Sequence, residues 1–289
     1  GMRVLILGGA GMVGRNLAAR LLVDGELGGK PIEALTLFDV VPAELQGTER
    51  TKVHVTAGDI SDAATVQALV ADRPEVIFHL AAIVSGEAEA DFDKGYRINL
   101  DGTRNLFEAI RALGDYLPRV VYTSSIAVFG APFPEAIGDE FLNAPMTSYG
   151  TQKMIGELLL NDYSRRGIFD GVGIRLPTIV VRPGKPNKAA SGFFSGIIRE
   201  PLAGLDAVLP VDDTVRHWVA STGAAPPVEM PMVTGARSTM AGMTKEHSSV
   251  RSTMLTGTPR ALHAADRACR SPSGAPAPTA IAIGMKPTM

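Results

Sequence analysis

The sequence has little that would mark a secreted, membrane-embedded or nucleic-acid-binding protein. It contains one cysteine, Cys269, in 289 residues, which excludes an internal disulfide framework and favours a reducing compartment. Its 28 Lys and Arg residues nearly balance 30 Asp and Glu residues, giving a formal net charge of -2. This balance indicates neither a nucleic-acid footprint nor an acidic tail. The first apolar run, MRVLILGG, is too short for a signal-peptide core or a membrane span. We therefore expect a cytoplasmic protein without nucleic-acid or membrane partners.

The last part of the chain also lacks the usual signs of a packed segment. From about Ser221 onward it has no aromatic residue, few branched aliphatic residues and no apolar period of 2 or 3.6. Two interpretations stand equally: a disordered tail, or an error of reading frame or sequence assignment. We therefore treat residues 221–289 as an atypical tail and assign it no function.

What the sequence does contain is a regular alternation of short apolar runs with longer segments of helical period. The strand candidates are residues 3–8, 34–39, 52–59, 75–82, 119–125 and 171–181, and the helix candidates between them are residues 12–25, 61–72, 95–113 and 148–167. Continuous apolar strands of this kind are typical of a parallel sheet buried on both faces. The pattern predicts an α/β fold with a Rossmann-type doubly wound sheet. A smaller C-terminal lobe, with a helix at 192–205 and a strand at 207–211, follows.

A glycine loop joins the first strand to the first helix. Gly8, Gly11 and Gly14 recur every three residues in GGAGMVG, with Met12 and Val13 at the helix start. Glycines at such a turn permit positive φ, close approach to a pyrophosphate and tight helix–sheet packing, while the helix N-terminus attracts the anion. A plain strand-to-helix turn would show the same glycines, so the motif needs a second signal.

Asp39 provides that signal, because it ends the second strand where an acidic residue accepts hydrogen bonds from ribose hydroxyls. Its carboxylate would repel a 2′-phosphate, and VVPAE after it has no Arg or Lys to replace it. The pair predicts NAD as the cofactor. Other strand ends that would line the cofactor, and that ordinary packing explains equally well, are Asp59 and Ile60 after the third strand and Leu80, Ala81 and Ala82 in the fourth.

The candidate catalytic residues follow the fifth strand. Tyr149 and Lys153 stand four residues apart in SYGTQK, so they share one face of a helix. A lysine ammonium and an oxidised nicotinamide both favour the phenolate, so Tyr149 can take a proton as hydride leaves the substrate. Lys153 can also hold the nicotinamide ribose. The remaining candidates are Ser125 to orient the reacting oxygen, Ser124 on the cofactor side, and Asn99 to bind cofactor, anchor a proton-relaying water or kink its helix.

Each of these signals is common by chance, but their order along the chain is specific. Through GGAGMVG, Asp39, GDI, HLAA, NLDGT, TSSIAVFG, SYGTQK and RLPTIVVRPG, residues 2–220 resemble the extended short-chain dehydrogenase/reductases, the NAD-dependent epimerase/dehydratase group. The resemblance implies Tyr149 as acid/base, Lys153 as its partner and Ser125 as the substrate-orienting hydroxyl. Residues 1–175 would then form the NAD-binding domain and residues 176–220 the substrate lobe.

The resemblance also suggests the substrate, which would be a small sugar acid such as D-erythronate, oxidised at C2. Its carboxylate requires cations, for which the candidates are Arg182, Lys185, Lys188 and Arg216; Thr178 is a further substrate-binding candidate, and His217 and Trp218 could floor the pocket. Two alternatives stay open: a nucleotide-sugar epimerase or dehydratase, and a dinucleotide sensor without catalysis. We expect a homodimer and no metal.

Overall fold

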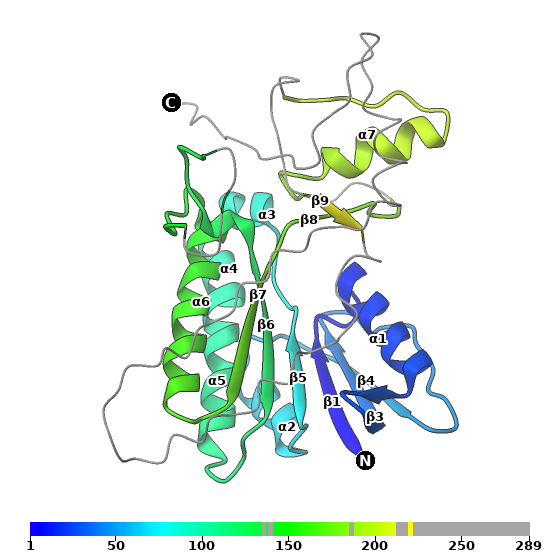
Figure 1. Cartoon of the computed structure of the whole chain (residues 1–289), viewed down its shortest axis with the longest axis vertical. Coiled ribbons are helices and arrows are strands. Elements are labelled where there is room, and N and C mark those ends of the chain that lie inside the picture. Colours follow the sequence, from blue (N-terminus) through cyan, green and yellow to red (C-terminus); the bar gives the residue numbers. More distant parts are fainter. Residues whose placement is uncertain (135–136, 138–140, 185–187, 212–218, 222–289) are drawn as a thin grey trace.

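The computed structural model describes residues 1–134, 137, 141–184, 188–211 and 219–221 (Figure 1). Its main sheet has seven strands. The strands are β1 (Met2–Leu7), β2 (Glu26–Leu27), β3 (Lys30–Asp39), β4 (Lys52–Ala57), β5 (Val76–His79), β6 (Arg119–Ser125) and β7 (Asp170–Leu176). The helices around it are α1 (Met12–Asp24), α2 (Ala63–Ala71), α3 (Ser85–Ala90), α4 (Phe92–Gly95), α5 (Gly102–Ala112) and α6 (Ser148–Arg165), with a π-helix, η1 (Tyr96–Asp101), and a 3-10 turn, η2 (Ile126–Val128).

The sheet is parallel in the order β4-β3-β1-β5-β6-β7, with β2 antiparallel beside the start of β3. β3 and β4 lie on one side of β1, and β5, β6 and β7 lie on its other side. The strand order therefore reverses at β1. In open sheets of this kind the ligand crevice lies outside the carboxyl ends of the strands at that reversal. The predicted α/β fold with a doubly wound parallel sheet is confirmed.

Two apolar cores cover the two faces of the sheet. On one face, α1 packs through Ala18 and Leu21 against the side chains of β1 and β3. On the other face, Val66 of α2, Leu106 of α5 and Leu160 of α6 meet the alternate side chains of β1, β5 and β6. Figure 1 shows α1 on one side of the sheet and α5 and α6 together on the other. This two-sided burial explains why most of the strands are continuous apolar runs.

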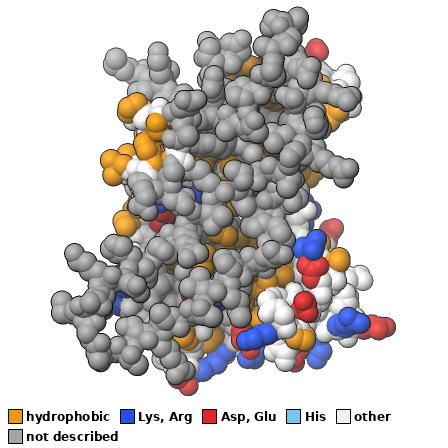
Figure 2. Space-filling model, in the orientation of Figure 1, with side chains coloured by type: hydrophobic (Ala, Val, Ile, Leu, Met, Phe, Trp, Pro, Cys, Tyr) orange, Lys and Arg blue, Asp and Glu red, His pale blue; other side chains and the backbone are white. Residues whose placement is uncertain are grey.

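The edge strand β4 is an exception, because most of its side chains are exposed. The prediction that the 52–59 run is buried on both faces was wrong. β4 pairs on one side only, with β3, and an edge strand needs less apolar cover than a central one. Charged side chains of both signs are interspersed along the part of the surface near the N-terminus (Figure 2).

A second, two-stranded parallel sheet lies beyond the carboxyl ends of the main strands, where Figure 1 also shows the last helix. It consists of β8 (Thr178–Val180) and β9 (Val219–Ser221), and the helix is α7 (Phe193–Leu202). The predicted strand at 207–211 was wrong, since these residues form no strand and Val208 is 80% exposed. Pro210 lacks an N–H for a ladder, and β8 pairs with β9 instead. The domain boundaries at 175 and 220 stay predictions, and residues 222–289 lie outside the described residues.

A buried ion pair fixes α6 to the edge of the sheet. Arg175 of β7 donates to both carboxylate oxygens of Glu157 on α6, at 2.9 and 2.7 Å. The two side chains are only 8% and 5% exposed. The Arg175 guanidinium also lies 4.9 Å from the centroid of the Phe129 ring. The pair therefore joins the last sheet strand to the helix that carries Tyr149 and Lys153.

Removing one partner of this pair leaves an uncompensated buried charge. We expect Arg175→Met to lower the free energy of unfolding by about 3–5 kcal/mol, measured by urea denaturation. The double variant Arg175→Met/Glu157→Leu should recover most of that loss, because no charge is then left alone. A loss below about 1 kcal/mol in the single variant would show that α6 does not depend on the pair.

Candidate active site

The glycine loop packs too closely for side chains at two of the three glycines that recur every three residues. Gly8 has φ of +90°, and a Cβ there would lie 2.8 Å from the backbone nitrogen of Ala81. A Cβ at Gly14 would overlap the carbonyl oxygen of Gly8. The loop after β1 therefore touches both the start of α1 and the segment after β5. This contact brings the predicted residues Leu80 and Ala81 to the glycine loop, at the reversal point of the sheet, and Ala82 follows them in the chain.

The start of α1 is available to an anion. Gly11 is its N-cap and no side chain caps it in the described part of the chain; its first turn also has no acidic residue. The first backbone N–H groups of a helix have no partner within the helix, and together with the helix dipole they attract negative charge. The predicted residues Met12 and Val13 belong to this turn, so the geometry fits a pyrophosphate.

Asp39 lies at the end of β3 beside the glycine loop. One carboxylate oxygen accepts the N–H of Ala10 at 3.0 Å, and the other accepts the N–H of Val40 at 2.8 Å. These bonds hold the carboxylate at the carboxyl edge of the sheet, and each oxygen keeps a lone pair for a further donor. Val40 and Val41 beside it are exposed. The position fits the predicted ribose contact.

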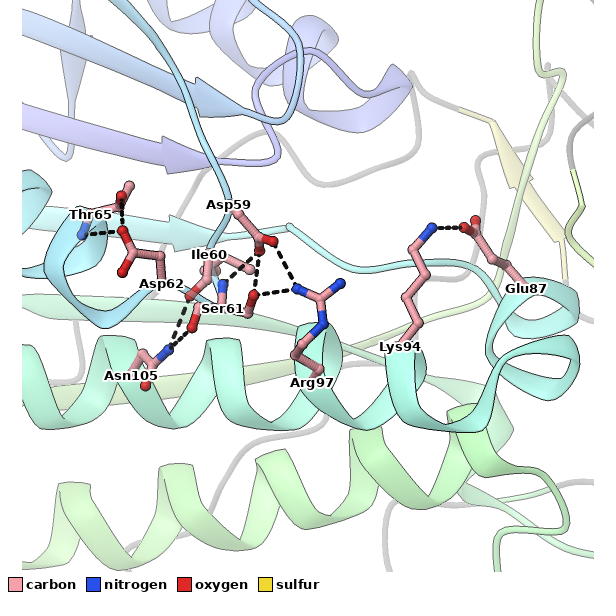
Figure 3. Close-up of polar contacts among 9 residues, drawn as sticks. All are labelled: Asp59, Ile60, Ser61, Asp62, Thr65, Glu87, Lys94, Arg97 and Asn105. Carbon is pink, nitrogen blue, oxygen red and sulfur yellow. Dashed lines mark hydrogen bonds and ion pairs between the residues drawn. The ribbon is translucent and has the colours of Figure 1, made fainter.

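Asp59 is tied into the turn that follows β4 (Figure 3). Its Oδ1 accepts the backbone N–H and the hydroxyl of Ser61, at 2.8 and 2.7 Å. Its Oδ2 accepts Nη1 of Arg97 at 2.8 Å. The Ser61 hydroxyl is the main cause of a lowered Asp59 pKa, and Arg97 adds to it. Asp59 therefore shapes this turn whether or not it meets the adenine as predicted.

Ile60 is 4% exposed and packs against the helix behind it, where a Cβ at Gly102 would come within 2.7 Å of its side chain. Asn105 donates to the carbonyl oxygens of Ile60 and Ser61 at 3.2 and 3.0 Å. The turn is thus held by side chains of η1 and α5. A surface pocket of about 360 Å³ on the outer side of this contact is lined by Ser61, Arg97, Asp101, Arg104, Asn105 and Glu108.

The candidate catalytic residues come together at the carboxyl end of β6. Thr147 caps α6 by accepting the N–H of Gly150 at 3.0 Å, so the helix begins immediately before Tyr149. Lys153 lies one turn further along, and its Nζ is 5.8 Å from the centroid of the Tyr149 ring. The same Nζ donates to the carbonyl oxygen of Thr123 at 2.7 Å. The lysine is 3% exposed, so β6 holds it in place.

Burial sets the protonation of both groups. It lowers the pKa of Lys153 from 10.5 to about 8, against an opposing effect of Glu157. It raises the pKa of Tyr149 from 10.0 to about 12, although the ring keeps partial exposure, and a hydrogen bond with the Ser125 side chain works against this rise. In the chain alone at neutral pH, Tyr149 is therefore a neutral phenol beside a largely protonated Lys153.

Ser124 and Ser125 are consecutive in β6, so their side chains point to opposite faces of the sheet and have different surroundings. The Ser125 hydroxyl accepts the N–H of Ala127 at 3.1 Å and contacts the Tyr149 phenol. Ser124 is 3% exposed, and its hydroxyl has no partner among the described residues. An unpartnered buried hydroxyl is costly, so Ser124 fits a site where a cofactor donates or accepts a hydrogen bond.

Asn99 is buried and bonded to other parts of the chain, as a structural residue is. It lies in the π-helix and is 2% exposed. Its side chain accepts the N–H of Ile83 at 2.9 Å, and its amide donates to the carbonyl oxygen of Ile83 at 3.3 Å and to Oε1 of Gln152 at 2.8 Å. Asn99 therefore clamps the segment after β5 to the catalytic helix, which suits the predicted kinked helix more than a water-binding role.

The candidate substrate residues are only partly described. Arg216 and Lys185, with His217 and Trp218, lie outside the described residues. Thr178 is half-buried in β8, and Lys188 is exposed. The backbone of Arg182 bonds to Ser195 and Arg199 of α7, at 3.0 and 2.7 Å. Burial and, secondly, the charge of Arg15 lower the pKa of Arg182.

Three residues that the sequence analysis did not single out complete the site: Thr123, Glu157 and Gln152. The Thr123 contact uses a backbone carbonyl and leaves no sequence signal. Glu157 stands four residues after Lys153, which is a spacing that could have been recognised. Gln152 lies within the SYGTQK motif but is fully buried, pointing to Asn99 instead of the catalytic face.

Comparison with known proteins gives the same class as the fold and site. The NAD dependent epimerase/dehydratase family matches residues 4–223. The chain belongs to this family and is an enzyme of the extended short-chain dehydrogenase/reductase type, with NAD as cofactor.

The names of individual relatives indicate a narrower activity than the family does. A D-erythronate dehydrogenase of Cupriavidus necator is 53% identical over 78% of this chain and 69% of its own length. One from Haemophilus influenzae is 44% identical over 76% and 68%. A solved Agrobacterium tumefaciens structure, described as a nucleoside-diphosphate-sugar epimerase, is 64% identical with a TM-score of 0.74, and covers 78% of this chain and 67% of that one. Among the described residues, no helix is long and apolar enough to cross a membrane.

The lowered pKa of Lys153 predicts a pH-dependent stability. Between about pH 8 and 10.5 the unfolded chain keeps a proton that the folded chain has released, so the free energy of unfolding rises with pH in this window. Lys153→Met lacks the group. Relative to that variant, the unaltered protein should gain about 3 kcal/mol across the window, at 1.36 kcal/mol per pKa unit. Urea unfolding at several pH values measures the gain, and parallel profiles for the two proteins would contradict the buried charge.

Proposed function

We propose that this protein is an NAD-dependent dehydrogenase that oxidises a small sugar acid, D-erythronate, at C2 to 2-dehydro-D-erythronate. The observation that carries the proposal is the convergence of Tyr149, Lys153 and Ser125 at the carboxyl end of β6, which is separated from β1 and its glycine loop by the single strand β5. The names of the two relatives at 53% and 44% identity give the substrate.

The cofactor contacts follow from the geometry of the crevice. The free N–H groups at the start of α1 would hold the pyrophosphate, and Asp39 would accept the adenosine ribose hydroxyls. Lys153 would donate to the nicotinamide ribose with the protons that its bond to Thr123 leaves free. Ser124 would gain the hydrogen bond that it lacks among described residues. Bound NAD would supply the hydride acceptor.

The proton then has a defined path. Ser125 would hold the C2 hydroxyl of the substrate beside the Tyr149 oxygen, since the two side chains already contact each other. Tyr149 would accept the hydroxyl proton as the C2–H bond breaks. With a pKa of about 12 the phenol gives little phenolate at neutral pH. Its hydrogen bond with Ser125, the protonated Lys153 and a positive nicotinamide ring all favour the phenolate.

The second candidate is a nucleotide-sugar epimerase, which the description of the Agrobacterium tumefaciens structure favours. It would use the same residues but return the hydride to its substrate. The decisive experiment is therefore a screen of NAD reduction with four-carbon and six-carbon sugar acids and with UDP-sugars. Release of NADH with D-erythronate supports the dehydrogenase. Conversion of a UDP-sugar without net NADH supports the epimerase.

Replacing the proposed base should separate binding from chemistry. Tyr149→Phe keeps the ring but removes the ionisable oxygen, so NAD affinity should persist while turnover falls by about two orders of magnitude or more. Initial rates of NADH formation and fluorescence titration with NAD measure the two effects. Ser125→Ala is the matched variant: the ascending limb of its pH profile should move to higher pH, because the hydrogen bond with Ser125 lowers the Tyr149 pKa. Near-normal turnover in Tyr149→Phe would remove the residue from the mechanism.

The cofactor preference should depend on the end of β3. Asp39→Ala removes the carboxylate that would repel a 2′-phosphate, and Val40→Arg adds a cation at an exposed position. The double variant should shift the ratio of kcat/KM values from NAD toward NADP by about tenfold or more, which corresponds to about 1.4 kcal/mol. A tenfold preference of the unaltered protein for NADP would show that Asp39 does not select the cofactor.

A further inference from the structure

The short helix α3 links the catalytic helix to the lobe. Near its C-terminal end, Glu89 accepts the backbone N–H of Ser148, the residue before Tyr149. At its N-terminal end, the Ser85 hydroxyl accepts the N–H of Ala190 at 3.2 Å. Figure 1 shows α3 at the end of the sheet nearest β8 and β9. One six-residue helix therefore contacts both the first residue of α6 and residues 188–190, which we call the lobe loop.

Gly86 allows the lobe loop to approach α3 this closely. A Cβ at this position would overlap the carbonyl oxygen of Lys188 and lie 3.3 Å from its carbonyl carbon. The glycine is not required by backbone conformation, because Gly86 is not among the glycines with positive φ. It is required by space, and the atoms that a side chain would displace are backbone atoms, which cannot rotate away.

The segment that leads into α3 is fixed in the candidate site. Ala81 abuts the glycine loop at Gly8, and Ile83 is held at its N–H and its carbonyl oxygen by Asn99. Residues 83–86 therefore run from the cofactor crevice to the lobe loop.

We propose that the docking of the lobe loop on Ser85 and Gly86 closes the outer end of the substrate site and restricts the substrate to short acids without a nucleotide group. The inference rests on the proposed function above and adds a limit on substrate size to it. A nucleotide-linked sugar would need a passage past the lobe from the reacting carbon, and in this proposal the close approach of Gly86 to the Lys188 backbone lies across that passage. A four-carbon acid needs only a closed site, from which water is excluded.

The test compares two glycine-to-alanine variants in the full chain. Gly86→Ala forces the lobe loop away from α3. Gly196→Ala, in α7, is the matched control, since a Cβ there would meet only the end of the Glu200 side chain, at 3.3 Å. For both variants and the unaltered protein, kcat and KM are measured with D-erythronate and with the six-carbon acid D-gluconate, and NAD affinity is measured by fluorescence.

We expect Gly86→Ala to raise the KM for D-erythronate and to shift the kcat/KM ratio of the six-carbon to the four-carbon acid upward by about tenfold, the effect of one or two methylene groups in a pocket. NAD affinity should stay unchanged. Ser85→Ala, which removes only the bond to Ala190, should shift the ratio in the same direction by about threefold. Gly196→Ala should leave the ratio as it is.

The experiment distinguishes a failure of the proposed function from a failure of the inference about substrate size. If the unaltered protein forms no NADH with any acid, the proposed function is wrong. If it oxidises D-erythronate but folded Gly86→Ala and Ser85→Ala keep the size ratio of the control, the docking does not limit the substrate and the inference alone is overturned. Should Gly86→Ala fail to fold, Ser85→Ala decides by the same ratio.

Discussion

The close packing of α6 on β6 and β7 is the constraint on which the site depends. Gly156 allows the approach, since a Cβ there would overlap the Tyr122 hydroxyl. Lys153 bonds to a β6 carbonyl and Glu157 to Arg175 of β7, so one face of α6 carries two successive polar ties to the sheet. Because Tyr149 is one turn before Lys153, these ties also determine where the phenol lies. An error in this packing would displace the proposed base and the proposed ribose donor together.

The same packing gives the site its electrostatic character. Removing Lys153 and Tyr149 from water disfavours their charged forms, which lowers one pKa and raises the other. Glu157 and Ser125 each oppose the effect of burial on one of them. A phenol and an ammonium group in water would keep their ordinary pKa values. The site thus holds a neutral acid that can become a base when a positive cofactor ring and a substrate hydroxyl are present, which suits reversible proton transfer.

Local signals in the sequence were sufficient for the parallel sheet, the glycine loop, Asp39 and the Tyr149 to Lys153 spacing, because each reflects a short-range rule of backbone or helix geometry. Contacts between distant segments had no such signal. The amide of Asn99 reaches Ile83 and Gln152, and the sequence offered three candidate roles for it without a choice among them. The apolar run at 207–211 resembled a strand, but pairing depends on a neighbour, and β8 pairs with β9. The exposure of β4 could not be predicted from its own residues either, because whether a strand lies at the edge of a sheet depends on the whole fold.

In a dehydrogenase the hydride of the substrate leaves the enzyme on NADH, whereas in an epimerase it returns to the substrate. Turnover of D-erythronate labelled with deuterium at C2 tests this most directly. We expect the released nicotinamide cofactor to carry the deuterium, in an amount equal to the oxo acid formed. Absence of labelled NADH, together with a UDP-sugar that is inverted while its own deuterium label stays in the sugar, would contradict it and assign the site to an epimerase.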